Sequence, residues 1–297
     1  MKKPFVVAIL CLILSAALLV WGFQGPDAGG VPPASPFAMA LTEDKGTAVM
    51  QFKQGAQTAA DELGIALHMY TTEQNAPADA QLQAWLNGLD GAGAIILPAC
   101  GPETVERAAA LAGRARVPLV LVGQEHAAAT ACVFFGPADQ GRALGRAMRE
   151  AGAERVAVYA DAGAAAQARI AGVQEAVGEL AYQYVGDPAD SGWETPPGAE
   201  ALALTPEWGA ALVGWRGVPA IWTVDPGGDQ VALLQSGQVA GVLMDMPFAL
   251  GYLAVSTAYE LAAGKEVPRA VFAPSRVVTP ETMYIAENIK VMFPLLQ

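Results

Sequence analysis

The chain has 297 residues, of which 53% are hydrophobic and 15% are charged, and its formal net charge at pH 7 is −12. So many apolar residues with so few charges argue against a disordered chain. The acidic balance and the absence of Lys/Arg clusters argue against a nucleic acid, or an anionic membrane surface, as a partner. We therefore expect a folded protein with one large or two modest domains.

The first 23 residues have the layout of an export signal. Lys2 and Lys3 precede an apolar run from Phe5 to Val20, and Trp21 closes the run. No pair of small residues suited to cleavage follows directly, which favours a retained signal anchor, although a cleaved signal peptide also fits the pattern. We expect an extracytoplasmic chain that meets the membrane through this segment, with a Pro/Gly linker over 24–36.

Cysteine is sparse after the N-terminal segment. Only Cys100 and Cys132 remain there, so an exported chain has the material for one disulfide. Two buried free thiols are the favoured alternative, because nothing in the sequence requires the pairing.

From residue 37 onward, short apolar runs alternate with segments of helical periodicity. Strands separated by helices of this length predict βαβ units and a parallel sheet covered by helices on both faces. The expected strands of the first half are 37–41, 65–70, 94–97 and 119–122, and the expected helices are 48–63, 78–89 and 103–115.

The same pattern restarts near residue 132 and predicts a second α/β lobe. A Pro/Gly loop at 186–198 stands where another crossover helix would be expected. The expected strands here are 132–135, 156–159, 201–204, 220–224, 239–244 and one near 271–272, and the expected helices are 140–151, 164–177, 208–215, 230–236 and 250–263.

Five stretches of the chain carry a family resemblance through their order and spacing. They are FKQGAQTAADELGIAL at 52–67, AIILPA at 94–99, AAAQARIAGVQEA at 164–176, VDPGGDQVALLQSGQVAGVLMDMP at 224–247 and LAAGKEVP at 261–268. In this order they resemble the ribose/galactose-type periplasmic sugar-binding proteins, whose fold is shared by effector domains of lactose-repressor-family regulators. The resemblance covers nearly everything between Phe37 and Val278.

The resemblance implies an α/β fold of two Rossmann-like lobes, the type I periplasmic binding protein architecture, with parallel sheets and a hinge of three crossings. It implies a ligand held in the interlobe cleft by hydrogen bonds and aromatic stacking as the hinge closes. The expected boundaries are 37–138 with 246–275 for lobe I, 139–245 with 276–287 for lobe II, and 288–297 for a tail.

Carried over position by position, the resemblance implies specific ligand contacts. Arg169 falls on a bidentate arginine, Asp225 on a carboxylate that accepts from ligand hydroxyls, and Asp245 on a polar position at the last crossing. Trp193 follows a PAD segment that is similar to the one bearing a stacking aromatic. Each also has a plain alternative: a solvated helix charge for Arg169, a turn aspartate for Asp225, a hinge cap for Asp245, and packing on its own lobe for Trp193.

Other positions depart from the family pattern. Lys45 and its neighbours stand where aromatics are usual after the first strand, Gln124 follows Gly123 where an Asp-Arg pair is usual, and Thr205 replaces an asparagine or aspartate. Pro137 takes the place of another aspartate. We keep Lys45, Gln124 and Thr205 as candidate contacts, and the changes predict either a different ligand or weakened binding.

No residue pattern points to catalysis or to a cofactor. The chain has no GxSxG nucleophile and no GxxxxGK[ST] phosphate loop, and its two histidines lie far apart in the sequence.

We therefore expect a solute-binding protein that captures a sugar-like molecule for an ABC permease or a membrane sensor. The alternative is a membrane-tethered relative that has lost binding and acts as an interaction module. An enzyme on the same fold is disfavoured for want of catalytic residues.

Overall fold

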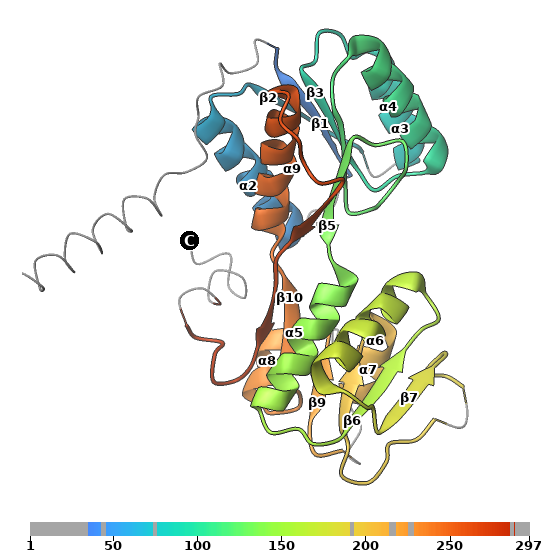
Figure 1. Cartoon of the computed structure of the whole chain (residues 1–297). Helices are drawn as coiled ribbons and strands as arrows, with labels where there is room; N and C mark the ends of the chain where they lie inside the picture. The colour runs from blue at the N-terminus through green and yellow to red at the C-terminus, as the bar shows by residue number, and fades with distance from the viewer. Residues whose placement is uncertain are drawn as a thin grey trace, which may run out of the picture.

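In the computed structural model the chain forms two α/β lobes stacked end to end, lobe I above and lobe II below in Figure 1. The structure describes residues 35–42, 46–73, 76–190, 193–213, 218–224, 229–285 and 288. The N-terminal segment, most of the linker, and most of the tail lie outside these ranges. None of the helices within them has the length and apolarity that crossing a bilayer needs.

Lobe I is a six-stranded sheet with helices on both faces, and its strand order is β11-β5-β4-β3-β1-β2. All pairs in this sheet are parallel, as expected from the βαβ pattern. Its strands are β1 Phe37–Leu41, β2 Leu67–Thr71, β3 Ala94–Pro98, β4 Leu119–Val122, β5 Ala131–Phe135 and β11 Ala270–Ala273; its helices are α2 Thr47–Leu63, α3 Ala78–Asn87, α4 Pro102–Ala115 and α9 Pro247–Ala262.

Lobe II repeats this plan with the strand order β12-β10-β9-β8-β6-β7. One pair, β10 with β12, is antiparallel, and the others are parallel. Its strands are β6 Val156–Ala160, β7 Tyr182–Val185, β8 Glu200–Ala203, β9 Ile221–Thr223, β10 Gly241–Asp245 and β12 Ser275–Val278; its helices are α5 Pro137–Glu150, α6 Ala164–Val177, α7 Pro206–Val213 and α8 Gln230–Gln235.

The chain passes between the lobes three times. It crosses between β5 and α5, between β10 and α9, and between β11 and β12, so the two sheets share three neighbouring connections (Figure 1). The strand near 271–272 therefore closes the sheet of lobe I, and the last strand, β12, closes that of lobe II.

Most of the elements expected from the sequence are present. The structure adds two strands and moves the start of one helix. The sequence pattern did not predict β7 or β12, which are four residues long and only partly buried. Helix α5 begins at Pro137 rather than near Gln140, because extended Gly136 precedes a proline whose fixed φ suits the first helical position. The described part of the 186–198 loop contains no helix, as its Pro/Gly content predicted.

Each lobe contains one pair of helices in backbone contact, and glycine makes both contacts possible. In lobe I, a Cβ added to Gly55 of α2 would lie 1.9 Å from the carbonyl oxygen of Phe248 in α9, and one on Gly251 would lie 2.1 Å from that of Phe52. A Cβ never approaches a backbone atom this closely. The α2–α9 pair therefore depends on glycine at both positions.

Lobe II contains the equivalent pair, α5 and α6. A Cβ on Gly141 would lie 2.0 Å from the carbonyl oxygen of Arg169, and one on Gly172 would lie 2.0 Å from that of Ala138. Two small residues on facing helices thus set how closely α6 lies on α5, and with it the position of Arg169.

We expect Gly55→Ala to lower the free energy of unfolding by roughly 1–3 kcal/mol, because the added methyl group forces α2 away from α9. Gly113→Ala is the matched control: Gly113 is also helical, in α4, and has nothing within 4 Å of an added Cβ. The control should be neutral or up to about 1 kcal/mol more stable, since alanine is the better helix former. Urea unfolding of both variants measures the difference, and equal stabilities would contradict the packing argument.

Candidate functional site

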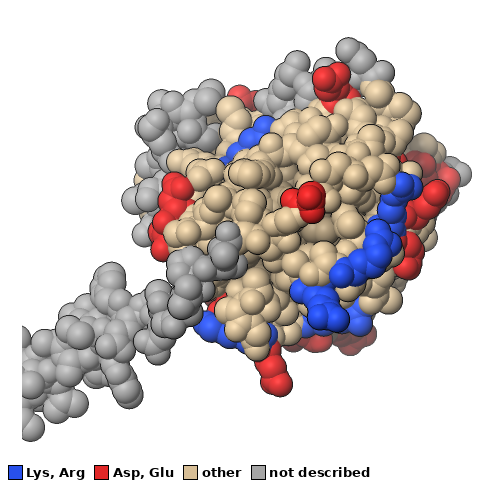
Figure 2. Space-filling model, turned by 90° about the horizontal axis from the view of Figure 1, so that it is seen from above, with Lys and Arg blue, Asp and Glu red and all other residues tan. Residues whose placement is uncertain are grey.

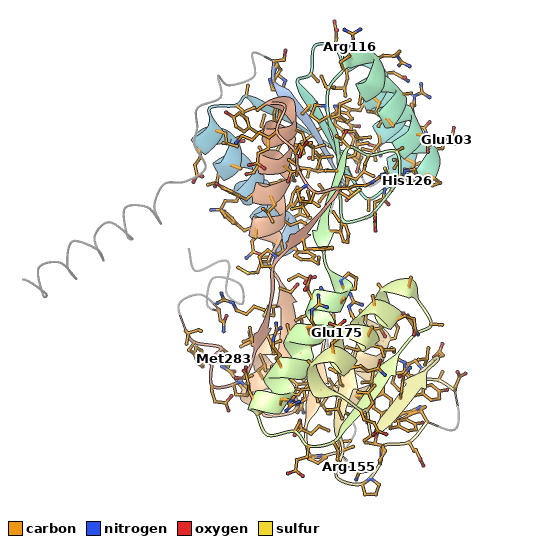
Figure 3. All side chains as sticks on the ribbon, viewed as in Figure 1. Glu103, Arg116, His126, Arg155, Glu175 and Met283 are labelled. Carbon is orange, nitrogen blue, oxygen red and sulfur yellow. The ribbon has the colours of Figure 1, made fainter. Side chains whose placement is uncertain are left out.

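A cavity of about 560 Å³ lies between the lobes, at the carboxyl ends of the lobe II strands. Its lining residues come from both lobes. In Figure 3, Arg116 and Arg155 label the two far ends of the molecule, and the cavity lies between the lobes, away from both ends. Ligands of parallel α/β sheets bind at this end of the strands. The cavity is lined by Thr47, Ala48, Gln51, Arg169, Pro206, Val224, Gln230, Leu243, Met244, Asp245 and Pro247.

Arg169 supplies the positive charge of this cavity. Its Nε donates to Oε1 of Gln140 at 2.8 Å, and its Nη1 donates to the carbonyl oxygen of Leu204 at 3.2 Å. Burial lowers the pKa of the Arg169 guanidinium, and the carboxylates of Asp245 and Asp161 oppose that shift. Within the described chain Nη2 makes no hydrogen bond, which leaves it available to a ligand oxygen.

Asp245 supplies the matching acceptor. It ends β10, directly opposite Ser275 at the start of β12. Its Oδ1 accepts from Nε2 of Gln140 at 2.8 Å and from Oγ of Ser275 at 2.6 Å. Oδ2 accepts no hydrogen bond from the described residues. One free donor and one free acceptor therefore border the same cavity.

Gln140 joins these groups into a network that touches all three crossings. It lies in the first turn of α5, just after the first crossing, whereas Asp245 precedes the second and Ser275 follows the third. Only 2% of the Gln140 surface is exposed. Its amide receives a hydrogen bond from Arg169 and donates one to Asp245, so the cavity-lining charges are linked directly to the hinge.

A second cavity of about 250 Å³ lies on the lobe I side, at the carboxyl ends of β1, β3, β4 and β5. Its wall is apolar, and two aromatic rings, Phe52 of α2 and Phe135 at the end of β5, contribute to it. Ala48 and Pro247 line both cavities. The lining is Ala40, Leu41, Thr42, Ala48, Val49, Phe52, Pro98, Val122, Gly123, Phe135, Pro247 and Leu250.

The residues predicted from the sequence are not all brought together. Arg169 and Asp245 line the interlobe cavity, while Lys45 and Asp225 lie outside the described residues. Val224, the residue before Asp225, does line the cavity. Gln124 lies beside the apolar cavity, next to Gly123, and its Nε2 donates to the carbonyl oxygen of Cys100 at 3.2 Å.

Trp193 packs on its own lobe, which is the alternative that the sequence left open. Its ring packs inside lobe II against Tyr159 and Trp208, with centroid distances of 5.8 and 5.2 Å, and its Nε1 donates to the carbonyl oxygen of Pro188 at 3.1 Å. It is not among the described residues that line the interlobe cavity. These contacts favour the packing alternative for Trp193 over stacking on a ligand.

Thr205 is buried and unusual in its bonding. Its hydroxyl, like that of Thr223 on the neighbouring strand, has no hydrogen-bond partner among the described residues, and the two residues are 3% and 0% exposed. An unpaired buried hydroxyl costs about 1–3 kcal/mol. Thr205 stands between Leu204, which accepts from Arg169, and Pro206, which lines the cavity.

Sequence reasoning missed Gln140, Ser275, Phe52 and Phe135. Gln140 left a signal, because it is the one amide on an otherwise small and apolar helical face that also includes Gly141, Leu144 and Met148. The sequence gives no signal for Ser275, Phe52 or Phe135. Each looks like an ordinary strand-end or core residue, and only the folded structure shows which residues it meets.

No three His, Cys, Asp or Glu side chains in the described ranges lie close enough together to hold a metal ion. Cys100 and Cys132 are free thiols in the structure.

Solved structures share this architecture. A glucose-galactose binding protein from Geobacillus stearothermophilus aligns over 85% of this chain and 100% of its own, with 18% identity and a TM-score of 0.64. The chain has the fold of the type I periplasmic binding proteins. A sugar-binding protein of a sugar ABC transporter from Bacillus halodurans covers 83% of this chain and 98% of its own at 16% identity and a TM-score of 0.66.

A third structure of the same fold contains a ligand. It is an ABC transporter solute-binding protein from Agrobacterium vitis bound to α-D-tagatopyranose, aligned over 86% of this chain and 99% of its own at 16% identity and a TM-score of 0.63. No family model and no curated protein sequence matches the chain. At these identities the likeness is one of fold.

We expect Gln140→Ala to lower the free energy of unfolding by about 1–3 kcal/mol, because it leaves the half-buried Arg169 and Asp245 without their common partner. Gln167→Ala, at an exposed position of α6, is the matched control and should change stability by less than about 0.5 kcal/mol. Chemical denaturation at pH 7 compares the two, and a Gln140 variant as stable as the control would show that the network contributes nothing.

Cys100 should react slowly with alkylating reagents at neutral pH. Burial, and to a smaller extent the nearby Asp79 carboxylate, raises the pKa of its thiol to about 11, so the reactive thiolate is scarce below that pH. The alkylation rate, followed by mass spectrometry of the Cys100 peptide, should rise about tenfold per pH unit between 7 and 10. A plateau near the ordinary thiol pKa of about 8.5 would contradict this expectation.

Proposed function

We propose that this protein is an extracytoplasmic solute-binding protein that captures a small, uncharged, sugar-like ligand between its lobes. The observation that carries the proposal is the Arg169–Gln140–Asp245 network, which borders the interlobe cavity and bonds to residues at the three crossings. A guanidinium and a carboxylate side by side can donate to and accept from neighbouring ligand hydroxyls. With one charge of each sign, the pair favours a neutral polyol over an ion.

Hinge closure gives these contacts a mechanical role. The two lobes, with boundaries proposed as 37–138 plus 246–275 and 139–245 plus 276–287, would close over the ligand. Phe52 and Phe135, which line the lobe I cavity, would cover the apolar C–H face of a sugar, while lobe II would bind its hydroxyls. The cavity volume of about 560 Å³ accommodates a molecule of this size.

Binding without catalysis is part of the same proposal. The cleft combines Arg169 and Asp245, but the described lining offers no serine or cysteine nucleophile beside a base. We propose no cofactor and no nucleic acid partner. Figure 2, looking down on the molecule from above, shows mostly uncharged surface with Lys and Arg in several places near its edges and Asp and Glu among them, rather than a broad basic face.

The proposed partner is an ABC permease or a membrane sensor that recognises the closed form. The N-terminal segment would export the chain and hold it at the membrane. This part of the proposal draws on the sequence pattern at residues 1–23 and on the printed names of the structural neighbours, several of which are transporter components.

A second candidate function is that of a tethered interaction module without a ligand. The apolar lobe I wall favours it, since sugar hydroxyls find only Thr42 as a polar side chain among the residues lining the lobe I cavity. The two functions differ in one measurable property, which is stabilisation by a small molecule.

We expect a sugar at about 100 times its dissociation constant to raise the free energy of unfolding by about 2.7 kcal/mol. A thermal-shift screen of the full-length chain against monosaccharides and polyols identifies the ligand, and calorimetry then measures its affinity. Arg169→Ala should weaken binding by about 10–100-fold, because a charged hydrogen bond is lost.

Arg146→Ala is the matched control for that experiment. Arg146 lies on α5, is exposed, and lines neither cavity, so its removal should leave the affinity unchanged. If no sugar or polyol stabilises the chain, the interaction module becomes the better account.

A further inference from the structure

The two walls of the cleft differ in chemistry. The described lining of the interlobe cavity on the lobe II side includes Arg169 and Asp245, whereas Thr42 is the only polar side chain among the described residues that line the lobe I cavity. Its other side chains include Val49, Phe52 and Leu250. A ligand held here would meet hydrogen-bonding groups on one side and hydrocarbon on the other.

The two cavities are neighbours. Ala48, in the first turn of α2, and Pro247, at the start of α9, line both of them. On α2, Thr47 and Gln51 line the interlobe cavity, whereas Val49 and Phe52 line the lobe I cavity. A molecule that extends past Ala48 and Pro247 would place one part of itself in each cavity.

The apolar cavity is poorly suited to sugar hydroxyls. A hydroxyl buried beside Val49, Phe52 and Leu250 would lose its water without gaining a protein partner. A hydrocarbon group in the same place removes apolar surface from water on both sides of the contact. The lobe I wall thus selects against a second polar ring and in favour of an apolar substituent.

The charges in the cleft bear on the net charge of the ligand. In the described lining of both cavities Arg169 and Asp245 are the charged side chains, and they have opposite signs. A net ionic ligand would leave one of them facing a like charge. Within this described lining, a neutral polar group meets no like charge, which favours a neutral polar part of the ligand.

We propose that the ligand is a neutral glycoside, with its sugar between Arg169 and Asp245 and a compact aryl or short alkyl aglycone in the lobe I cavity bordered by Val49 and Phe52. This inference rests on the proposed function, because it assumes that the cleft binds a sugar-like molecule. It adds the chemical class of the second half of that molecule.

The test uses matched probes on the full-length chain. Free glucose, galactose and arabinose are each compared with their methyl and phenyl β-glycosides by calorimetry. For at least one sugar, the phenyl glycoside should bind at least about tenfold more tightly than the methyl glycoside, since the two differ only in the apolar group.

Two variants assign that gain to the lobe I cavity. Val49→Asn should reduce the phenyl advantage to about threefold or less while leaving methyl glycoside affinity unchanged, and Val49→Thr, which keeps the side-chain shape, should reduce it in the same direction. Met50→Asn is the control, because Met50 is the next residue of α2, is 51% exposed and lines neither cavity.

The outcomes separate this inference from the proposed function. Tight binding of free sugars or methyl glycosides with no gain from the phenyl group overturns the aglycone cavity and leaves sugar capture standing. A phenyl gain that survives both Val49 variants also overturns it. If none of the free sugars or glycosides binds, the proposed function and this inference are both wrong.

Discussion

The close approach of paired helices at glycine is the constraint on which the rest of this structure depends. Gly141 and Gly172 let α5 and α6 meet at backbone contact, and Gly55 and Gly251 do the same for α2 and α9. In lobe II this contact places Arg169 within hydrogen-bonding distance of Gln140. A helix pair held one methyl group farther apart would separate these side chains, so the site depends on residues that have no side chain of their own.

The hydrogen-bond network built on that contact has an unusual position. Gln140, Asp245 and Ser275 belong to three separate crossings, yet they bond to one another within lobe II. The three crossings are thereby joined by hydrogen bonds at their lobe II ends. Under the proposed function, a ligand that binds Nη2 of Arg169 or Oδ2 of Asp245 would contact groups already bonded to these crossings.

The two sides of the cleft differ in polarity, because the two lobes contribute different side chains to it. Lobe II contributes the charged side chains Arg169 and Asp245 to the interlobe cavity. Lobe I ends its strands beside the second cavity in Leu41, Pro98, Val122 and Phe135. The two neighbouring cavities thus differ in their described lining, and a ligand with a polar and an apolar half would match both.

The sequence by itself determined the alternation of strands and helices, because apolar periodicity and glycine or proline boundaries are local properties of the chain. Through the resemblance of short motifs it also predicted Arg169 and Asp245 as ligand contacts, and both line the interlobe cavity. Only the tertiary structure decided that Trp193 packs in its own core, that β7 and β12 form, and that Gln140 and Ser275 complete the network. The reason is physical: these features depend on contacts between residues from 5 to 135 positions apart, and no local pattern records which distant residue will supply the partner.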